Sequence, residues 1–178
     1  IAFAALTGCA VVDESSNRLA SDVHMDPLTC SSQLVGSSRS ARGELDSGDI
    51  RMVNWNIQKG GDPQWTTDLT TFQGDHDLMV LQEAPLNSNA WDVVSTDQYH
   101  SFAPGYRTSR SLTGVMTVSA VKPLTQCNFG SVEPWLRSPK ATVITEYGLT
   151  DTDQTLVVVN IHAMNFTFGA HDFRMQIQ

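Results

Sequence analysis

The chain has 178 residues, 40% of them hydrophobic and 17% charged, which excludes a disordered protein and is typical of one folded domain with a sizeable core. Its formal net charge of −8 and pI near 4.9 argue against a protein that wraps non-specifically around a polyanion such as DNA. A small basic site that works with a divalent cation is still compatible with this charge.

Residues 1–9 are predicted to be the end of a signal peptide. The first five residues are apolar, and Leu-Thr-Gly-Cys at 6–9 resembles the lipobox of bacterial lipoproteins, in which the Cys is lipidated after cleavage. Small residues before the cut fit the peptidase, and the Cys9 thiol accepts the lipid. The alternative is a short buried strand with a free Cys.

Residues 10–48 are polar and rich in Ser, and they are predicted to tether the membrane anchor to the domain. Cys30 interrupts this tract. In an exported protein Cys30 and Cys127 could form a disulfide that pins the tether to the domain. Two unpaired thiols are the alternative, and the sequence leaves both open.

The folded region is predicted to begin near Asp49. Segments with the composition of strands fall at 50–53, 78–81, 99–103, 113–120, 140–149 and 155–163. Helices are predicted from Asp62-Pro63 onward and at 87–96, and 105–112 is predicted to be a loop. In the first helix Trp65, Leu69 and Phe72 recur at the spacing of one face. This order of strands and helices predicts an α/β layered fold.

Three apolar strands carry a polar residue at or near their ends, namely Asn56, Glu83 and His162. A Glu at the end of a buried strand is unfavourable unless it is paired or bound to a cation, so Glu83 is a candidate metal ligand. An exposed Glu in a turn is the alternative. A His that ends a core strand is as often structural as functional. Asn160, on the same strand face as His162, is expected to orient it.

Short patterns around these residues resemble a known family. Trp55-Asn56-Ile57, Leu81-Gln82-Glu83 and Asn160-Ile161-His162 are similar to the successive signatures of the endonuclease/exonuclease/phosphatase superfamily, which includes DNase I. Longer patterns at 55–59, 81–84, 114–117 and 159–166 resemble its uncharacterised bacterial branch. The resemblance runs from about Asp49 to Gln178, and the four motifs occur in the family's order.

The resemblance implies a role for each residue. Asn56 and Glu83 would hold Mg²⁺ (or Mn²⁺), and His162, with Asn160, would serve catalysis at the scissile phosphate. Lys59, Arg110 and Lys140 are cationic candidates for contact with that phosphate, and only Lys59 lies inside one of the motifs. Ordinary solvated side chains are the alternative for the last two.

The family's later Gly-Asp-x-Asn motif and its terminal Asp-His pair do not occur in the chain. The chain opens on Ile1 and closes within a helical pattern at 173–178, so it is interpreted as a fragment truncated on both sides. The resemblance therefore implies a partial four-layer α/β/β/α sandwich of the DNase I type over 49–178, with its C-terminal half missing. Such a fragment is expected to lack cover for its inner face, to fold poorly and to be inactive alone.

Together these features predict a Mg²⁺-dependent phosphoesterase of the bacterial cell envelope, anchored by lipid on the periplasmic or extracellular face. The substrate class stays open among nucleic acid, lipid head groups and small phosphodiesters, with a slight tilt away from duplex DNA. No obligate protein partner is inferred. The alternative is a lipid-anchored binding or structural domain in which the same residues only pack the core.

Overall fold

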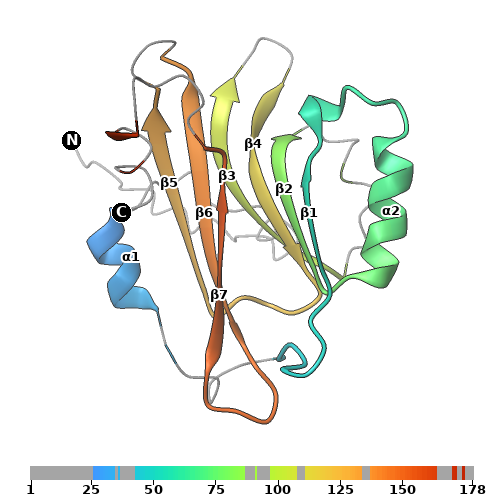
Figure 1. Cartoon of the computed structure of the whole chain (residues 1–178), viewed down its shortest axis with the longest axis vertical. Helices are drawn as coiled ribbons and strands as arrows, with labels where there is room; N and C mark the ends of the chain where they lie inside the picture. The colour runs from blue at the N-terminus through green and yellow to red at the C-terminus, as the bar shows by residue number, and fades with distance from the viewer. Residues whose placement is uncertain are drawn as a thin grey trace, which may run out of the picture.

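A computed structural model of the chain describes residues 26–34, 36, 43–86, 91, 97–107, 111–133, 137–163, 170, 171 and 174. Its elements are shown in Figure 1 and are, in chain order, α1 (Pro27–Gln33), β1 (Met52–Asn56), the short 3-10 helix η3 (Gln58–Gly60), α2 (Trp65–Asp75), β2 (Leu78–Pro85), β3 (Tyr99–Arg107), β4 (Leu112–Ser119), β5 (Thr125–Val132), β6 (Pro139–Gly148) and β7 (Thr155–Ile161). Among the described residues, no helix is long and apolar enough to cross a membrane.

The strands form two sheets. One has the order β1-β2-β4-β3 and the other β5-β6-β7. β1 and β2 run parallel, because α2 carries the chain back between them, and all other pairs are antiparallel. Figure 1 shows that β1, β2 and β7 end at the same end of the molecule. Side chains at these three strand ends can therefore meet.

The two sheets pack face to face and share a core. Their inner faces contribute two buried clusters, one of Leu45, Leu78, Val80, Tyr147 and Val158 and one of Ala103, Val115, Ala141 and Val143. Burial of each Leu or Val side chain contributes about 1.5–3 kcal/mol to the free energy of unfolding. The expectation that the inner face lacks cover is therefore wrong, because this chain supplies both sheets.

α2 covers the other face of the four-stranded sheet, as Figure 1 shows. Trp65 and Leu69 are buried there, and Phe72 packs beside them. These are the residues whose helical spacing predicted the helix. The predicted helix at 87–96 lies outside the described residues except for Trp91, whose indole donates a hydrogen bond to the Pro85 carbonyl.

β5 was not predicted, because its sequence, Thr-Gln-Cys-Asn-Phe-Gly-Ser-Val, lacks an apolar run. Its inward side includes Gln126, whose Oε1 accepts a hydrogen bond of 2.7 Å from Ser101 Oγ on β3. This polar contact links the sheets and allows an amide to occupy a position where the core usually takes a hydrophobic residue. The predicted loop at 105–112 also begins later than expected, since β3 continues to Arg107.

The structure differs from the predicted polar tether in two places. Pro27–Gln33 form α1, and the Asp26 carboxylate caps the helix by accepting from the Thr29 backbone N–H. Further along, Leu45 is buried and pairs with Leu149. Polar composition hid both features, because α1 is held by a cross-link and not by an apolar face.

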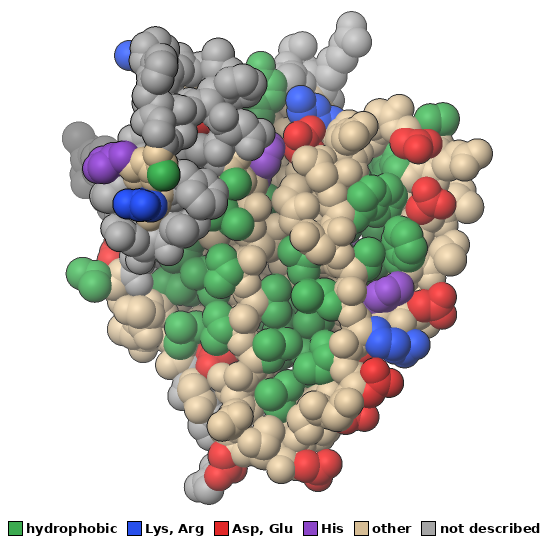
Figure 2. All heavy atoms as spheres, in the orientation of Figure 1, with side chains coloured by type: hydrophobic (Ala, Val, Ile, Leu, Met, Phe, Trp, Pro, Cys, Tyr) green, Lys and Arg blue, Asp and Glu red, His purple; other side chains and the backbone are tan. Residues whose placement is uncertain are grey.

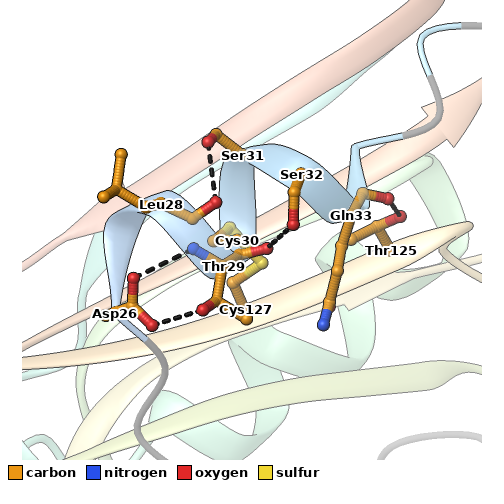
Figure 3. Close-up of a disulfide and its surroundings, with 9 residues drawn as sticks. All are labelled: Asp26, Leu28, Thr29, Cys30, Ser31, Ser32, Gln33, Thr125 and Cys127. Carbon is orange, nitrogen blue, oxygen red and sulfur yellow. Dashed lines mark hydrogen bonds between the residues drawn. A yellow bond between two sulfur atoms is a disulfide. The ribbon is translucent and has the colours of Figure 1, made fainter.

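That cross-link is the disulfide between Cys30 and Cys127, shown in Figure 3. The two Cα atoms are 5.8 Å apart, within the range predicted for a bridge. Thr125 Oγ1 on the same strand also donates to the Gln33 carbonyl at the end of α1. The helix is thus attached to β5 at two points.

The surface is mixed in character. Figure 2 shows hydrophobic side chains gathered in the middle of one face and acidic side chains mainly along its lower and right-hand edges. Val157 and Val159 on β7 are 43% and 54% exposed. The acidic edges agree with the negative net charge.

Candidate functional site

Asn56 and Glu83 meet at the carboxyl ends of two neighbouring parallel strands. The register pairs Asn56 of β1 with Gln82 of β2, so the next residue on β2 lies beside the end of β1. Asn56 Nδ2 donates a hydrogen bond of 3.3 Å to Glu83 Oε1. The Asn56 Oδ1 atom accepts from the Gln58 backbone N–H at 2.9 Å. Both side-chain atoms of Asn56 are therefore used within the site.

A β-bulge in β2 directs Glu83 toward this edge. Leu81 pairs with Met116 on β4 and Ala84 pairs with Gly114, so two residues of β2 oppose one residue of β4. Glu83 has a φ of 52°, which a residue other than Gly adopts at a strain of about 1–3 kcal/mol. Surrounding contacts must therefore hold this conformation in place.

Lys59 approaches the same carboxylate from the turn after β1. Its Nζ lies 3.8 Å from Glu83 Oε2, and its side chain is 60% exposed. The turn is tight, because a Cβ on Gly60 would lie 2.9 Å from Trp65 Nε1. An exposed pair of this kind adds little stability, so Lys59 is better suited to contact a ligand than to hold the fold.

His162 reaches Glu83 from the other sheet. His162 is the first residue after β7, and its backbone N–H donates to the Ala141 carbonyl on β6. Its Nε2 lies 3.7 Å from Glu83 Oε1. The structure thus brings Asn56, Glu83 and His162 together, as expected from their positions at strand ends.

Burial lowers the pKa of His162 below its ordinary value, and the positive charge of Lys140 lowers it further. The carboxylates of Glu83 and Glu133 act in the opposite direction, and Lys59 adds a smaller lowering effect. His162 is therefore mainly neutral at pH 7. A neutral imidazole has one nitrogen that donates and one that accepts a hydrogen bond.

Lys140 is a buried residue and not a solvated one. Its Nζ lies 3.6 Å from Glu133 Oε1, with side-chain exposures of 8% and 1%, and the Ser138 hydroxyl donates to the other Glu133 oxygen. A buried carboxylate needs such partners. Glu133 could not be predicted as the partner of Lys140, because it follows an exposed strand end and belongs to no motif. Arg110 and Cys9 lie outside the described residues.

Asn160 contacts different groups from the expected one. Its side chain is buried and hydrogen-bonds Gln82 and the backbone of β2 and β4. These bonds use both of its polar atoms. Gln82 was part of a motif but was given no role, since it precedes the more conspicuous Glu83.

Two side chains at this edge have oxygen atoms of the kind that a hydrated Mg²⁺ ion would need. Within the part of the chain that the structure describes, no three His, Cys, Asp or Glu residues gather at a metal-binding distance. Glu83 supplies one anionic oxygen, and Asn56 can supply an amide oxygen by turning its amide away from Gln58. Mg²⁺ commonly keeps several waters and takes one or two protein ligands plus a substrate phosphate.

The lowered pKa of His162 predicts a loss of stability in acid. The folded state binds fewer protons than the unfolded state between the folded pKa and about 6.5, so the free energy of unfolding falls as pH drops through that window. His162→Asn should flatten this part of the profile. Urea unfolding in EDTA from pH 4 to pH 8 measures it. Parallel profiles for the two proteins would contradict the assignment.

No protein-family model matches the chain. Curated relatives are UPF0294 proteins, including those of Vibrio cholerae (34% identical over 142 residues, 75% of this chain and 47% of the relative), Vibrio vulnificus (33% over 154 residues, 82% and 51%) and Yersinia enterocolitica (35% over 130 residues, 72% and 50%). The chain therefore spans about half the length of the curated relatives it matches.

Solved structures with a similar fold include endonuclease/exonuclease/phosphatase proteins. A family member from Leptotrichia buccalis has a TM-score of 0.53 at 12% identity, covering 70% of this chain and 56% of its own. The catalytic domain of human Nocturnin with a bound sulfate anion has a TM-score of 0.55 at 16% identity, covering 74% and 56%. The resemblance seen in the motifs is thus confirmed at the level of fold. The chain has part of the DNase I-like α/β architecture, represented by its two sheets.

Proposed function

We propose that this protein is a metal-dependent hydrolase of phosphoester bonds. The observation that carries the proposal is the meeting of Asn56, Glu83 and His162 at one edge, with Lys59 beside them. These residues come from two sheets and from three separate parts of the chain. The hydrolase fold of the structural neighbours supports the same conclusion.

The site combines one carboxylate with cationic and neutral hydrogen-bond donors. Glu83 and Asn56 would hold Mg²⁺ or Mn²⁺, and the bound cation would supply stabilisation for negative charge on a phosphate oxygen. Neutral His162 donates a hydrogen bond toward the same phosphate without carrying a charge of its own. Lys59, at the exposed side, attracts the phosphate and holds its non-reacting oxygen.

An anionic ligand of tetrahedral shape is also consistent with the neighbours, because the human Nocturnin domain holds a sulfate anion. The acidic surface of this chain disfavours a long duplex, whose binding needs many phosphate contacts. We therefore place small phosphodiesters and lipid head groups ahead of duplex DNA as substrates. Single-stranded nucleic acid is an outcome that the assay below distinguishes.

We further propose that the protein works outside the cytoplasm, attached to the bacterial envelope through Cys9. The disulfide between Cys30 and Cys127 supports an oxidising compartment. A lipid on Cys9 and the polar residues after it would leave the domain facing the periplasm or the exterior.

The proposal is tested with the protein as its own gene encodes it. A panel of a phosphomonoester, a small phosphodiester, single-stranded DNA and RNA, and phospholipid vesicles is assayed with Mg²⁺, with Mn²⁺ and after EDTA. We expect hydrolysis of at least one phosphodiester that EDTA abolishes and Mg²⁺ restores. Absence of hydrolysis across the panel, together with absence of Mn²⁺ binding by calorimetry, would favour a binding or structural domain instead.

A further inference from the structure

We propose that Asn160 and Gln82 are positioning residues that hold the β-bulge and thereby aim Glu83 at the site. This inference rests on the proposed function for its metal readout, but its structural part can be tested without metal. It gives a role to Asn160, whose side chain joins β7 of the second sheet to β2, the strand that carries Glu83.

Asn160 is fully buried on β7, yet its amide crosses to the backbone of the other sheet. Its Nδ2 donates to the Leu81 carbonyl at 3.1 Å and to the Met116 carbonyl at 2.9 Å. Leu81 and Met116 are cross-strand partners, and theirs is the last regular pair before the bulge. A bulge interrupts the hydrogen-bond ladder, and Asn160 supplies donors at the point of interruption.

Gln82 continues the network through the bulge itself. Its Nε2 donates to Asn160 Oδ1 at 2.9 Å and to Asn54 Oδ1 on β1 at 2.8 Å. The amide therefore links β1, β2 and β7 one residue before Glu83. Both protons of the Gln82 amide are engaged, so rotation of this side chain would break at least one bond.

The direction of the Glu83 side chain depends on the alternation of side chains along β2. Side chains alternate between the two faces of a sheet, and a shift of one residue moves each side chain to the opposite face. Without the bulge, β2 would pair regularly with β4 beyond Leu81, and the Glu83 side chain would change direction. The strained φ of Glu83 favours that relaxation. The bonds from Asn160 and Gln82 oppose it.

A purely structural role for Asn160 would be exchangeable with other contacts between the sheets. Ser101 and Gln126 provide the matched comparison, because their hydrogen bond of 2.7 Å also joins the two sheets. Neither residue contacts the bulge or Glu83 through any contact that the structure records. Ser101→Ala therefore removes an inter-sheet bond without affecting the aim of the carboxylate.

The test compares Asn160→Leu, Gln82→Leu and Ser101→Ala with the wild type in the full chain. Mn²⁺ affinity is measured by calorimetry, amide hydrogen exchange is followed at residues 82–84, and the thermal midpoint reports stability. We expect Asn160→Leu and Gln82→Leu to weaken Mn²⁺ binding about tenfold or more, as loss of residues that orient ligands does, and to speed exchange at 82–84. Ser101→Ala should change neither.

Each outcome separates the two proposals. If the wild type binds no Mn²⁺, the proposed function fails, and the hydrogen exchange result alone decides the present inference. If Asn160→Leu does not fold, the milder Gln82→Leu carries the test, because Gln82 is only partly buried. Unchanged exchange at 82–84 in a folded variant, or equal weakening of Mn²⁺ binding in Ser101→Ala, would overturn the positioning role.

Discussion

Replacing Glu83 with Gln is expected to lower the metal-dependent hydrolysis of a phosphoester by about a hundredfold to a thousandfold or more. The change keeps the size and shape of the side chain and removes only its negative charge. The amide oxygen of Gln can still accept from Asn56 Nδ2, the contact that Glu83 Oε1 makes. Glu83 is the carboxylate that contacts Asn56, Lys59 and His162, so its charge is what a bound cation would need.

Turnover is measured with saturating and with limiting Mg²⁺, and calorimetry reports Mn²⁺ affinity. Glu44→Gln serves as the matched control, since Glu44 is exposed and outside the site; it should leave turnover unchanged. The circular dichroism spectrum and thermal midpoint of Glu83→Gln should stay close to those of the wild type. Turnover that survives Glu83→Gln would show that this carboxylate does not hold the cation, and the proposed site would be wrong.

The sequence predicted the members of the site better than their mutual geometry. Asn56, Glu83 and His162 were found because each follows an apolar strand, and parallel strands end at a common edge. The bulge at Glu83 could not be predicted, because it depends on how β2 pairs with β4. A strand end and a bulge followed by two more paired residues look alike in a single sequence.

The buried partners of Lys140 and Asn160 were harder to predict than the members of the site. Lys140 was predicted as a phosphate contact from its charge alone, but the structure pairs it with Glu133 below the surface. Asn160 was expected to orient His162 because the two residues lie on the same face of one strand. Its actual partners lie on β2 and β4, which are distant in sequence. Long-range polar contacts of this kind leave no periodic signal.

For the fold, the strands that were predicted share strong apolar content, and the one that was missed does not. β5 is completed by polar contacts and by the bridge at Cys127, so hydrophobic pattern alone could not reveal it. Without β5, the second sheet could not be predicted as a layer of three strands. The wrong expectation that the inner face of the chain is uncovered came from the family resemblance, which implies that both halves of a full-length protein build the two sheets.

Removal of the disulfide is expected to have the largest effect on stability. Changing both Cys30 and Cys127 to Ser should lower the free energy of unfolding by about 2–5 kcal/mol, because the bridge closes a long loop and limits the unfolded chain. The sequence separation of the two residues is 97. Such a loss is a large share of a total that is typically about 5–15 kcal/mol.

Loss of the disulfide should also destabilise α1 locally. Without the bridge, α1 keeps the hydrogen bond from Thr125 Oγ1 to the Gln33 carbonyl, and the following segment keeps that from the Gly36 N–H to the buried Glu146. A helix of seven residues is too short to persist on its own propensity. We therefore expect fast amide exchange across 27–33 in the double variant while the two sheets remain protected.

Chemical denaturation of wild type and double variant, each with and without a reductant, measures the effect. Both cysteines are almost fully buried, so the reductant should act on the wild type mainly after unfolding, and it should then reproduce the midpoint of the variant. The variant itself should not respond to the reductant, which controls for effects on other groups. Two free thiols in protein from an oxidising compartment, or a wild-type midpoint that the reductant leaves unchanged, would show that the bridge does not contribute to the native fold. The envelope location proposed from the bridge would then lose its structural support.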